Sequence, residues 1–472
     1  MLKKEAVSMG ILAAVMVPHP PLIVPEIGRG EEEKIKDTIR GFAKASELIA
    51  GSEPETVVII SPHSAFYSDC FHISPGNSAS GDLAKFGAHR VTFDVRYDSE
   101  FVFELEKRAQ REKIKAGTMG EREKSLDHAT TVPLYFLKKA WGGVIPCRIV
   151  RIGLSGLSLE EHYRFGIVIK KTAEELGKAV CVIASGDLSH VLKREGPYGY
   201  RQEGPEYDKR IMDVMSRAAF GELFEFTDLF CERAAECGHR SFTIMAGCFD
   251  GLSVKAEMLS YEGPFGVGYG VCTFIPGAPD PARKFLSAKE AESDISAEAV
   301  KVQESPYVRL ARAAVEKYVS SGKIVSIPDG LPDEALSRRA GAFVSLKKFG
   351  QLRGCIGTIS PAEATIAEEI IHNAISASTR DPRFPPVSPS ELKDLVYSVD
   401  ILGDTEYIDS PDDLDVEKYG VIVSNGYRRG LLLPNLEGIE SVDEQISIAM
   451  QKAGIRKGER IRLQRFEVVR YH

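Results

Sequence analysis

Three histidines follow short apolar runs, a position from which imidazoles could bind a metal or move a proton. His19 follows ILAAVMVP, His63 follows VVIISP, and His190 closes SGDLSH after AVCVIAS. For any one of them alone, a turn or capping role is the simpler interpretation. Together they favour a metal site, because neutral imidazole is the commonest metal ligand in proteins. His19 and His63 are too far apart for one helix and suit two strands joined by a crossover.

A carboxylate would complete such a site. Two imidazoles and one carboxylate leave positions open on iron for a substrate and an oxidant. The candidates are Glu236 in AAECGHRSFTIMAG, Glu257, and Glu262 in SYEGPFGVGYG. Glu236 is preferred because it precedes a Cys-Gly break and an apolar helix, whereas Glu262 could simply cap a turn. A fourth histidine, His128 in SLDHATTVPLYFL, precedes another expected helix and would be oriented from a turn.

The elements that would position these residues alternate along residues 1–275. Four runs are short, β-branched and apolar at every position, which is typical of strands covered by helices on both faces; they are residues 11–17, 56–61, 148–155 and 179–185. Amphipathic helices are predicted between them at 31–50, 99–112, 158–177 and 207–219. We therefore expect an α/β domain with a central, mostly parallel sheet flanked by helices. In such sheets, ligands bind beyond the carboxyl ends of the strands.

The chain is too long for one ordinary core, since it has 472 residues. Residues 276–303 contain prolines, alanines and charges but few large apolar side chains, and we interpret them as a linker. Residues 304–472 then form a second domain that begins with an amphipathic helix at 305–322. Because strand and helix patterns mix in this domain, we expect it to be α+β.

Composition argues against several classes of partner. The formal net charge is -8 and no basic run is interleaved with aromatics, so we expect no nucleic acid or anionic membrane partner. No apolar run is long enough to span a membrane. The eight cysteines form no CxxC pair, which is typical of reduced thiols without disulfides. The apolar run ILAAVMV is too short for a signal peptide and Glu5 interrupts the basic region, so we expect a cytoplasmic protein.

The second domain has one stretch that could carry chemistry, QLRGCIGTISP at 351–361. Cys355, beside Arg353, could be a nucleophile with a lowered pKa. A buried, inert thiol is the commoner alternative, because cysteine is among the most often buried residue types. His372 lies in a helical pattern and is expected on a helix face.

The motifs of the first domain resemble a known superfamily. PHPP, ISPH, LDHATTVPL, SGDLSH and ECGHR, in this order over residues 9–275, are similar to LigB-type class III extradiol dioxygenases and their Memo-like relatives. The resemblance implies iron(II) bound by His19, His63 and Glu236. His190 would be the acid/base residue and His128 a substrate-site histidine. It further implies an oxidoreductase that opens a catechol-like small aromatic diol with dioxygen.

One departure leaves the third ligand open. The Memo-like relatives carry cysteine in that place, and here Glu236 and Cys237 are adjacent. A thiolate would favour softer ions such as copper(I) or zinc, whereas a carboxylate suits non-haem iron.

The second domain resembles the AMMECR family over residues 304–472, through LRGCIGT, DPRFPPV and RGLLLP. This implies a compact α+β domain without an established activity, and the loop at 428–445 lacks a tryptophan-containing insert common in relatives. The fusion resembles the AmmeMemoRadiSam system, whose modules accompany a radical SAM enzyme. It implies an alternative function, a Memo-like metal-binding partner of such an enzyme without dioxygenase activity. A degenerate metal-binding scaffold is a third possibility.

Overall fold

The apolar runs of the first unit form adjacent strands of one six-stranded sheet. The computed structural model describes residues 10–121, 124–291, 304–348, 351–436 and 438–472. Along the sheet the strands are β7 (Arg148–Gly153), β2 (Thr56–Ser61), β8 (Ala179–Ser185), β1 (Gly10–Val17), β10 (Tyr269–Pro279) and β9 (Leu252–Glu262). The first four pair in parallel, and β10 and β9 add an antiparallel edge. The prediction of a mostly parallel sheet is confirmed.

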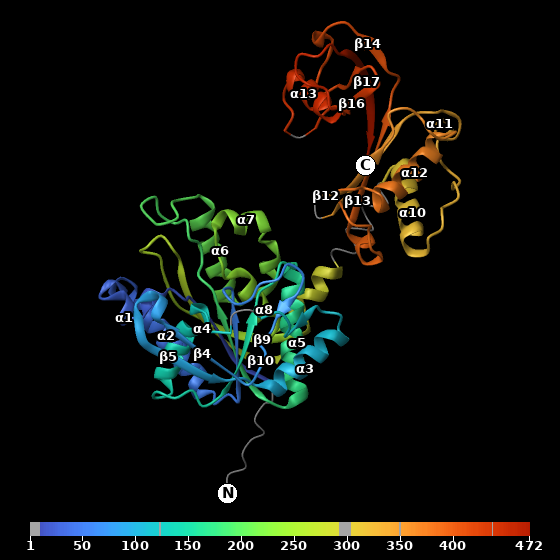
Figure 1. The fold of residues 1–472 in the computed structure, drawn as a ribbon. Helices are drawn as coiled ribbons and strands as arrows, with labels where there is room; N and C mark the ends of the chain where they lie inside the picture. Colours follow the sequence, from blue (N-terminus) through green and yellow to red (C-terminus); the bar gives the residue numbers. More distant parts are fainter. Residues whose placement is uncertain (1–9, 122–123, 292–303, 349–350, 437) are drawn as a thin grey trace. The chain divides into compact units, whose positions relative to one another are not determined.

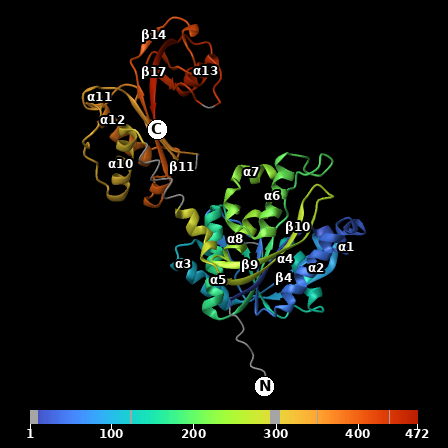
Figure 2. The ribbon, with the colours of Figure 1, turned by 180° about the vertical axis from the view of Figure 1, so that it is seen from behind.

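Helices cover both faces of this sheet, as the continuous apolar strands require (Figures 1 and 2). In β1, Ala14 and Met16 belong to one core, while Ala13 and Val15 belong to the other. On the first side lie α3 (Ser99–Arg111), α5 (Leu159–Leu176), α6 (Glu203–Arg217) and α8 (His239–Gly247). On the second lie α2 (Lys36–Gly51) and α4 (His128–Ala140).

Short elements complete the first unit. Strand β3 pairs in parallel with β6, and β4 pairs antiparallel with β5, outside the main sheet. The bounds are β3 (Phe71–His72), β4 (Ser78–Leu83), β5 (Ala88–Arg96), β6 (Ala116–Gly117), α1 (Pro25–Gly28) and α7 (Asp228–Ala234).

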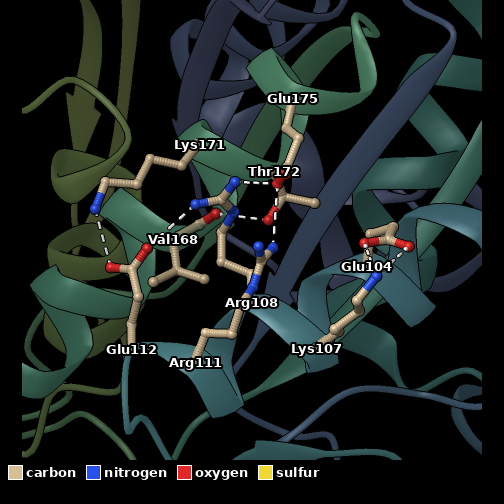
Figure 3. A network of polar contacts seen from close by, with 9 residues as sticks. All are labelled: Glu104, Lys107, Arg108, Arg111, Glu112, Val168, Lys171, Thr172 and Glu175. Atoms are coloured by element: carbon tan, nitrogen blue, oxygen red, sulfur yellow. Dashed lines mark hydrogen bonds and ion pairs between the residues drawn. The ribbon is translucent and has the colours of Figure 1, made fainter.

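Charged side chains join α3 to α5 on the outside of the first core (Figure 3). Arg108 and Arg111 of α3 both pair with Glu175 of α5, and Lys171 of α5 lies 2.9 Å from Glu112. Because most of these groups are exposed, each pair stabilises the fold only weakly. Their main effect is to satisfy charge where the two helices pack.

The first unit continues past the expected boundary at 275. Residues 276–279, assigned above to the linker, still belong to β10, and Leu286 is buried in the same core as α5. The division between the two units falls after Ala291. Apolar residues after 275 are few, but Leu286 suffices to attach this segment to the core.

The second unit is built on an antiparallel sheet, and its predicted α+β class is confirmed. Its strands run in the order β12 (Gln351–Gly357), β11 (Ala342–Lys348), β13 (Leu395–Leu402), β17 (Arg462–Tyr471), β15 (Tyr419–Asn425) and β16 (Arg428–Leu432), with β14 (Glu406–Ile408) also paired to β17. Helices α10 (Pro306–Ser321) and α12 (Ile366–Thr379) share a core with β11 and β13. Helix α13 (Val442–Lys452) packs on β15 and β16, and α11 (Asp333–Ser337) is a short turn.

Local signals explain where α10 begins and ends. The Ser305 hydroxyl accepts a hydrogen bond from the N–H of Val308, and Pro306 occupies the first turn, where a missing N–H costs nothing. Gly322 ends the helix with a φ of 68°, a left-handed conformation that glycine adopts without strain.

Among the described residues, no helix is both long enough and apolar enough to cross a membrane.

We expect Phe42→Ala to destabilise the first unit by about 3–5 kcal/mol, because the ring is fully buried and its loss leaves a cavity. The Phe42 ring stacks on Phe136 with centroids 4.1 Å apart. The measurement is urea unfolding followed by fluorescence of Trp141, the sole tryptophan, which lies at the end of α4. As the matched control, Phe103→Ala should change the free energy of unfolding by less than about 0.5 kcal/mol, since Phe103 is 62% exposed. Equal effects of the two variants would contradict the packing described.

Candidate metal centre

The topology brings the ends of β1 and β2 to one edge of the sheet. Strand β8 lies between them and all three run parallel, so their carboxyl ends meet. His19 and His63 each follow two residues after the end of their strand. Cys237 enters from the turn before α8. The ligand atoms of these three residues all lie within 4.8 Å of one another.

The nitrogens and the sulfur are spaced as metal donors are. His19 Nε2 lies 3.1 Å from His63 Nε2 and 3.6 Å from Cys237 Sγ. Bonds of about 2.0–2.3 Å to a tetrahedral ion place donors about 3.3–3.8 Å apart. A single transition-metal ion therefore fits the donor set with small adjustments.

His19 is held by the residues that follow β8. Its ring Nδ1 lies 3.0 Å from the Ser185 hydroxyl, which leaves Nε2 directed at His63 and Cys237. Its main-chain N–H donates to the Asp187 carboxylate at 2.8 Å. Asp187 also anchors Cys237, since the Asp187 N–H donates to Sγ and the Cys237 N–H donates to the Asp187 carbonyl, each at 3.3 Å. The contact between the Ser185 hydroxyl and Nδ1 fixes the orientation of the His19 ring, as hydrogen bonds to ligating imidazoles commonly do.

His63 and His128 are linked through the end of β2. The Ser61 hydroxyl accepts from the His63 N–H at 3.2 Å and donates to the Asp127 carboxylate at 2.6 Å. Asp127 in turn caps α4 by accepting from the Thr130 N–H, and His128 is the first residue of that helix. The His128 ring stacks on the His63 ring with centroids 4.4 Å apart.

His190 stands beside the cluster but apart from the stack. Its ring lies 5.3 Å from that of Tyr198 between centroids, and its charge contributes to lowering the pKa of His19. Burial lowers the pKa of His190 and lowers that of His128 to about 4. Both imidazoles are therefore neutral near pH 7 and able to accept a proton.

Glu236, the preferred carboxylate ligand, does not reach the cluster. Its Oε2 accepts a hydrogen bond from the main-chain N–H of His239, at 2.6 Å, in the first turn of α8. The carboxylate is thus used at the helix N-terminus, where negative charge is favourable. The neighbouring side chain, Cys237, takes the place next to His19. The alternative third ligand is the one that the geometry supports.

The other two carboxylate candidates also have structural partners. Glu262 accepts hydrogen bonds from the N–H and hydroxyl of Thr38 in the first turn of α2, at 2.6 and 2.7 Å. Glu257 forms an exposed ion pair with Lys44.

The electrostatics of the cluster suit a cation. Burial, together with the nearby histidines, lowers the pKa of His19 well below its ordinary value, so the ring is neutral as a ligand must be. Burial raises the pKa of Cys237 well above its ordinary value. Since a bound metal ion favours the thiolate, it would reverse this shift. Two neutral imidazoles and a thiol that a cation would ionise are donors suited to zinc, copper or iron.

A cavity of about 680 Å³ opens beside His63 and His128. Its walls include the rings of Phe66, Tyr67 and Phe86. Arg151 also lines it; this buried guanidinium is held by Glu121 at 2.6 Å and by the Ser74 hydroxyl at 2.7 Å. His190 is not among the residues that line the cavity.

Sequence reasoning missed the groups that hold the ligands. Ser185 and Asp187 lie in ASGDLSH, and Asp127 lies in LDHATT, both within motifs from which only the histidines were selected. For Ser185 and Asp187 the signal was their place at the end of a strand, at the edge where the histidines meet; for Asp127 it was its place as the N-cap of an expected helix. Arg151 gave no such signal, because it lies inside an apolar strand.

In the second unit, Arg353 is not beside the Cys355 thiol. It is the extra residue of a β-bulge, because Lys347 pairs with Leu352 and Leu346 with Gly354. Its guanidinium pairs with Glu391 and donates to the Pro385 carbonyl. A cation that contacts Cys355 is Arg383, which donates to the Cys355 carbonyl at 3.1 Å. His372 lies on the surface of α12, with Nδ1 2.9 Å from Glu363.

Comparison with known families divides the chain in the same way. The family described as "Catalytic LigB subunit of aromatic ring-opening dioxygenase" matches residues 13–272, and the AMMECR1 family matches residues 308–472. A protein of Clostridium acetobutylicum is 40% identical over 471 residues, which are 98% of this chain and 99% of that one. A protein of Thermotoga maritima is 51% identical over 172 residues, 36% of this chain and 99% of its own.

Two solved structures resemble parts of the chain. An uncharacterized protein from Pyrococcus horikoshii has 33% identity and a TM-score of 0.33, covering 35% of this chain and 88% of that one. An uncharacterized protein from Escherichia coli K12 has 15% identity and a TM-score of 0.38, and the match covers 56% of this chain and 99% of that one.

Ser185→Ala should weaken metal binding by about 10- to 100-fold while leaving the donor set intact, because it removes the hydroxyl that orients His19. The measurement is a titration with zinc in competition with a chromophoric chelator. Ser78→Ala, at an exposed position of β4, is the matched control and should leave the affinity unchanged. An unaltered affinity in Ser185→Ala would show that the hydroxyl does not position the imidazole.

Proposed function

Since this chain belongs to the LigB family through residues 13–272 and to the AMMECR1 family through residues 308–472, we propose that its first unit is a metal-dependent oxidoreductase of the extradiol dioxygenase type. Its substrate would be a catechol-like aromatic diol, opened with dioxygen. The observation that carries this proposal is the convergence of His19, His63 and Cys237 beside a cavity with aromatic walls.

His19, His63 and Cys237 would hold the metal, iron(II) in this proposal. When bound, it would supply Lewis acidity and a template that orients the two reactants. Zinc or copper is the alternative ion, because a thiolate donor suits softer metals. Ser185 and Asp187 keep His19 and Cys237 in place whichever ion is bound.

The cavity suits a small aromatic ring. Phe66 is 55% exposed and Phe86 is 40% exposed, and both line it. Exposed aromatic side chains around one hollow favour an aromatic ligand, because stacking and edge contacts bury both surfaces. The Phe86 ring also lies 5.5 Å from the His128 ring between centroids, so a substrate seated there would contact His128.

Two neutral histidines would handle the protons. His190 lies outside the cavity lining but close enough to His19 and His63 to interact with them electrostatically. From that side of the metal ligands it would accept a proton from a substrate hydroxyl and return it to the product, as a general base and then acid. His128, which lines the cavity, would hold the second hydroxyl by a hydrogen bond. Lowered pKa values support both roles, since a protonated imidazole could not accept.

The identity of the third donor, a cysteine, supports a second candidate function. Cys237 lies with His19 and His63 where a third donor is needed, and the Memo-like resemblance implies cysteine as that donor in place of a carboxylate. Under this candidate, the unit is a metal-binding partner in a radical-SAM-associated modification and consumes no oxygen with any catechol. The metal ligands are common to both candidates, whereas a proton-transfer role for His190 belongs only to the first.

Metal content is expected to separate Cys237 from Glu236. Protein purified without oxygen should contain metal, and His19→Ala and Cys237→Ser should lose most of it, because each removes a donor. Glu236→Gln is the matched control, since an amide oxygen can still accept from the His239 N–H. It should retain the metal when analysed by mass spectrometry. Loss of metal in Glu236→Gln, with retention in Cys237→Ser, would reverse the assignment.

Oxygen consumption decides between the two candidates. With iron(II) and a panel of catechols, wild-type protein should take up oxygen and form a yellow ring-opened product. His190→Gln should keep its metal but lower kcat by about 10²–10⁴-fold, because a general acid/base is lost. Metal-loaded wild-type protein that takes up no oxygen with any catechol would reject the dioxygenase and select the second candidate.

A further inference from the structure

A second cavity, of about 620 Å³, lies within the second unit on the open face of its sheet. In β11, Ala342, Val344 and Leu346 point into the core that contains α10 and α12. Phe343 and Ser345 alternate with them and line the cavity. The cavity therefore lies on the sheet face opposite these helices.

Neighbouring strands place Cys355 in a polar row across this face. Ser345 of β11 pairs with Cys355 on one side and with Ser398 on the other, and all three line the cavity. The Ser345 hydroxyl donates to Cys355 Sγ at 3.2 Å. In the next row, Phe343 lies over Gly357, where a Cβ would be 2.2 Å from the ring. A side chain at position 357 would therefore displace the Phe343 ring.

Among the side chains that line the cavity, cations outnumber carboxylates. Lys347, Arg383, Lys452 and Arg470 line it, Asp400 is the side-chain carboxylate among the described lining residues, and His472 lines it as well. Asp400 is already paired with Arg470, at 2.7 Å. Arg383 is paired with Asp381, which does not line the cavity and which also accepts a hydrogen bond from the Cys355 N–H at 2.8 Å. These pairs orient the two guanidinium groups but leave an uncompensated positive charge.

Lys347, at an exposed position of β11, and Lys452, at the end of α13, carry that charge. Neither ammonium has a hydrogen-bond or ion-pair partner among the residues that the structure describes. Although the Lys452 side chain is largely exposed, partial desolvation at the cavity wall lowers its pKa; the nearby Cys355 opposes this shift and Arg383 adds to it, so the two cations are close enough to repel each other. An anion between them would relieve this repulsion.

The remaining wall of the cavity is apolar. Leu352 is 41% exposed, and it faces the cavity together with Phe343, Ile359, Leu431, Leu433 and Leu436. Apolar walls with a few converging charged groups are typical of small-molecule sites, and the volume lies within their usual range of roughly 300–1,000 Å³.

We propose that this cavity binds a small organic anion, with its apolar body against the leucines and its charged group between Lys452 and Arg383, beside the Cys355 thiol. The site lies wholly in the second unit, so it is independent of the oxidoreductase proposed for the first. Under this proposal Cys355 is part of a ligand site and is not an inert thiol of the core.

A pair of alkylating reagents of nearly equal size tests the charge of the site. Iodoacetate is an anion and iodoacetamide is neutral, and both can be followed at each cysteine by peptide mass spectrometry on the full chain. For each cysteine, the rate of alkylation by iodoacetate is divided by the rate of alkylation by iodoacetamide. In low salt this ratio should be at least about ten times larger for Cys355 than for Cys70. Cys70, beside Asp69, is the internal control. Salt should reduce the difference.

Protection by a carboxylate tests the apolar part. Octanoate should slow alkylation of Cys355 by iodoacetamide but not that of Cys70, whereas octanamide and acetate should protect far less. Lys452→Gln should reduce both the octanoate protection and the iodoacetate preference several-fold, and Lys457→Gln, an exposed lysine that does not line the cavity, should change neither. Equal reagent ratios at the two cysteines, or no protection by octanoate, would overturn the proposal.

Discussion

The geometry of the candidate metal centre depends on Asp187, a buried carboxyl group two residues after β8. Its side chain accepts the main-chain N–H of His19, and its own main chain exchanges hydrogen bonds with Cys237. Burial raises its pKa to about 7, and the bond from His19 opposes that shift. Buried polar groups of this kind are costly unless they are paired, so the segments after β1 and β8 and the turn before α8 can pack only in this mutual arrangement.

Much of this arrangement could be predicted from the sequence. Runs that are apolar at every position identified β1, β2, β7 and β8 within about two residues, because such strands must be covered on both faces. The parallel order then placed His19 and His63 at one edge. The short pairs β3–β6 and β4–β5 were not predicted, since two-residue and polar strands carry no comparable pattern.

Two details of the candidate site depend on local backbone geometry. Glu236 and Cys237 are adjacent, and only the path of the turn into α8 decides which side chain faces the histidines. Arg353 was expected beside the Cys355 thiol because the two are near in the sequence, but Arg353 is the extra residue of a β-bulge and its guanidinium pairs with Glu391. In both cases the decisive feature is one local backbone irregularity, which residue types and spacing do not encode.

The link between Ser61 and Asp127 has a mechanical consequence. Ser61 accepts the main-chain N–H of His63 and donates to Asp127, and Asp127 caps the helix that begins with His128. One hydroxyl therefore ties the loop after β2 to the N-terminus of α4. Because β2 pairs with β8 and β8 with β1, backbone hydrogen bonds of the sheet hold the strand ends that precede His63 and His19. Loss of the Ser61 hydroxyl would thus loosen His128 against His63 more than it would separate His63 from His19.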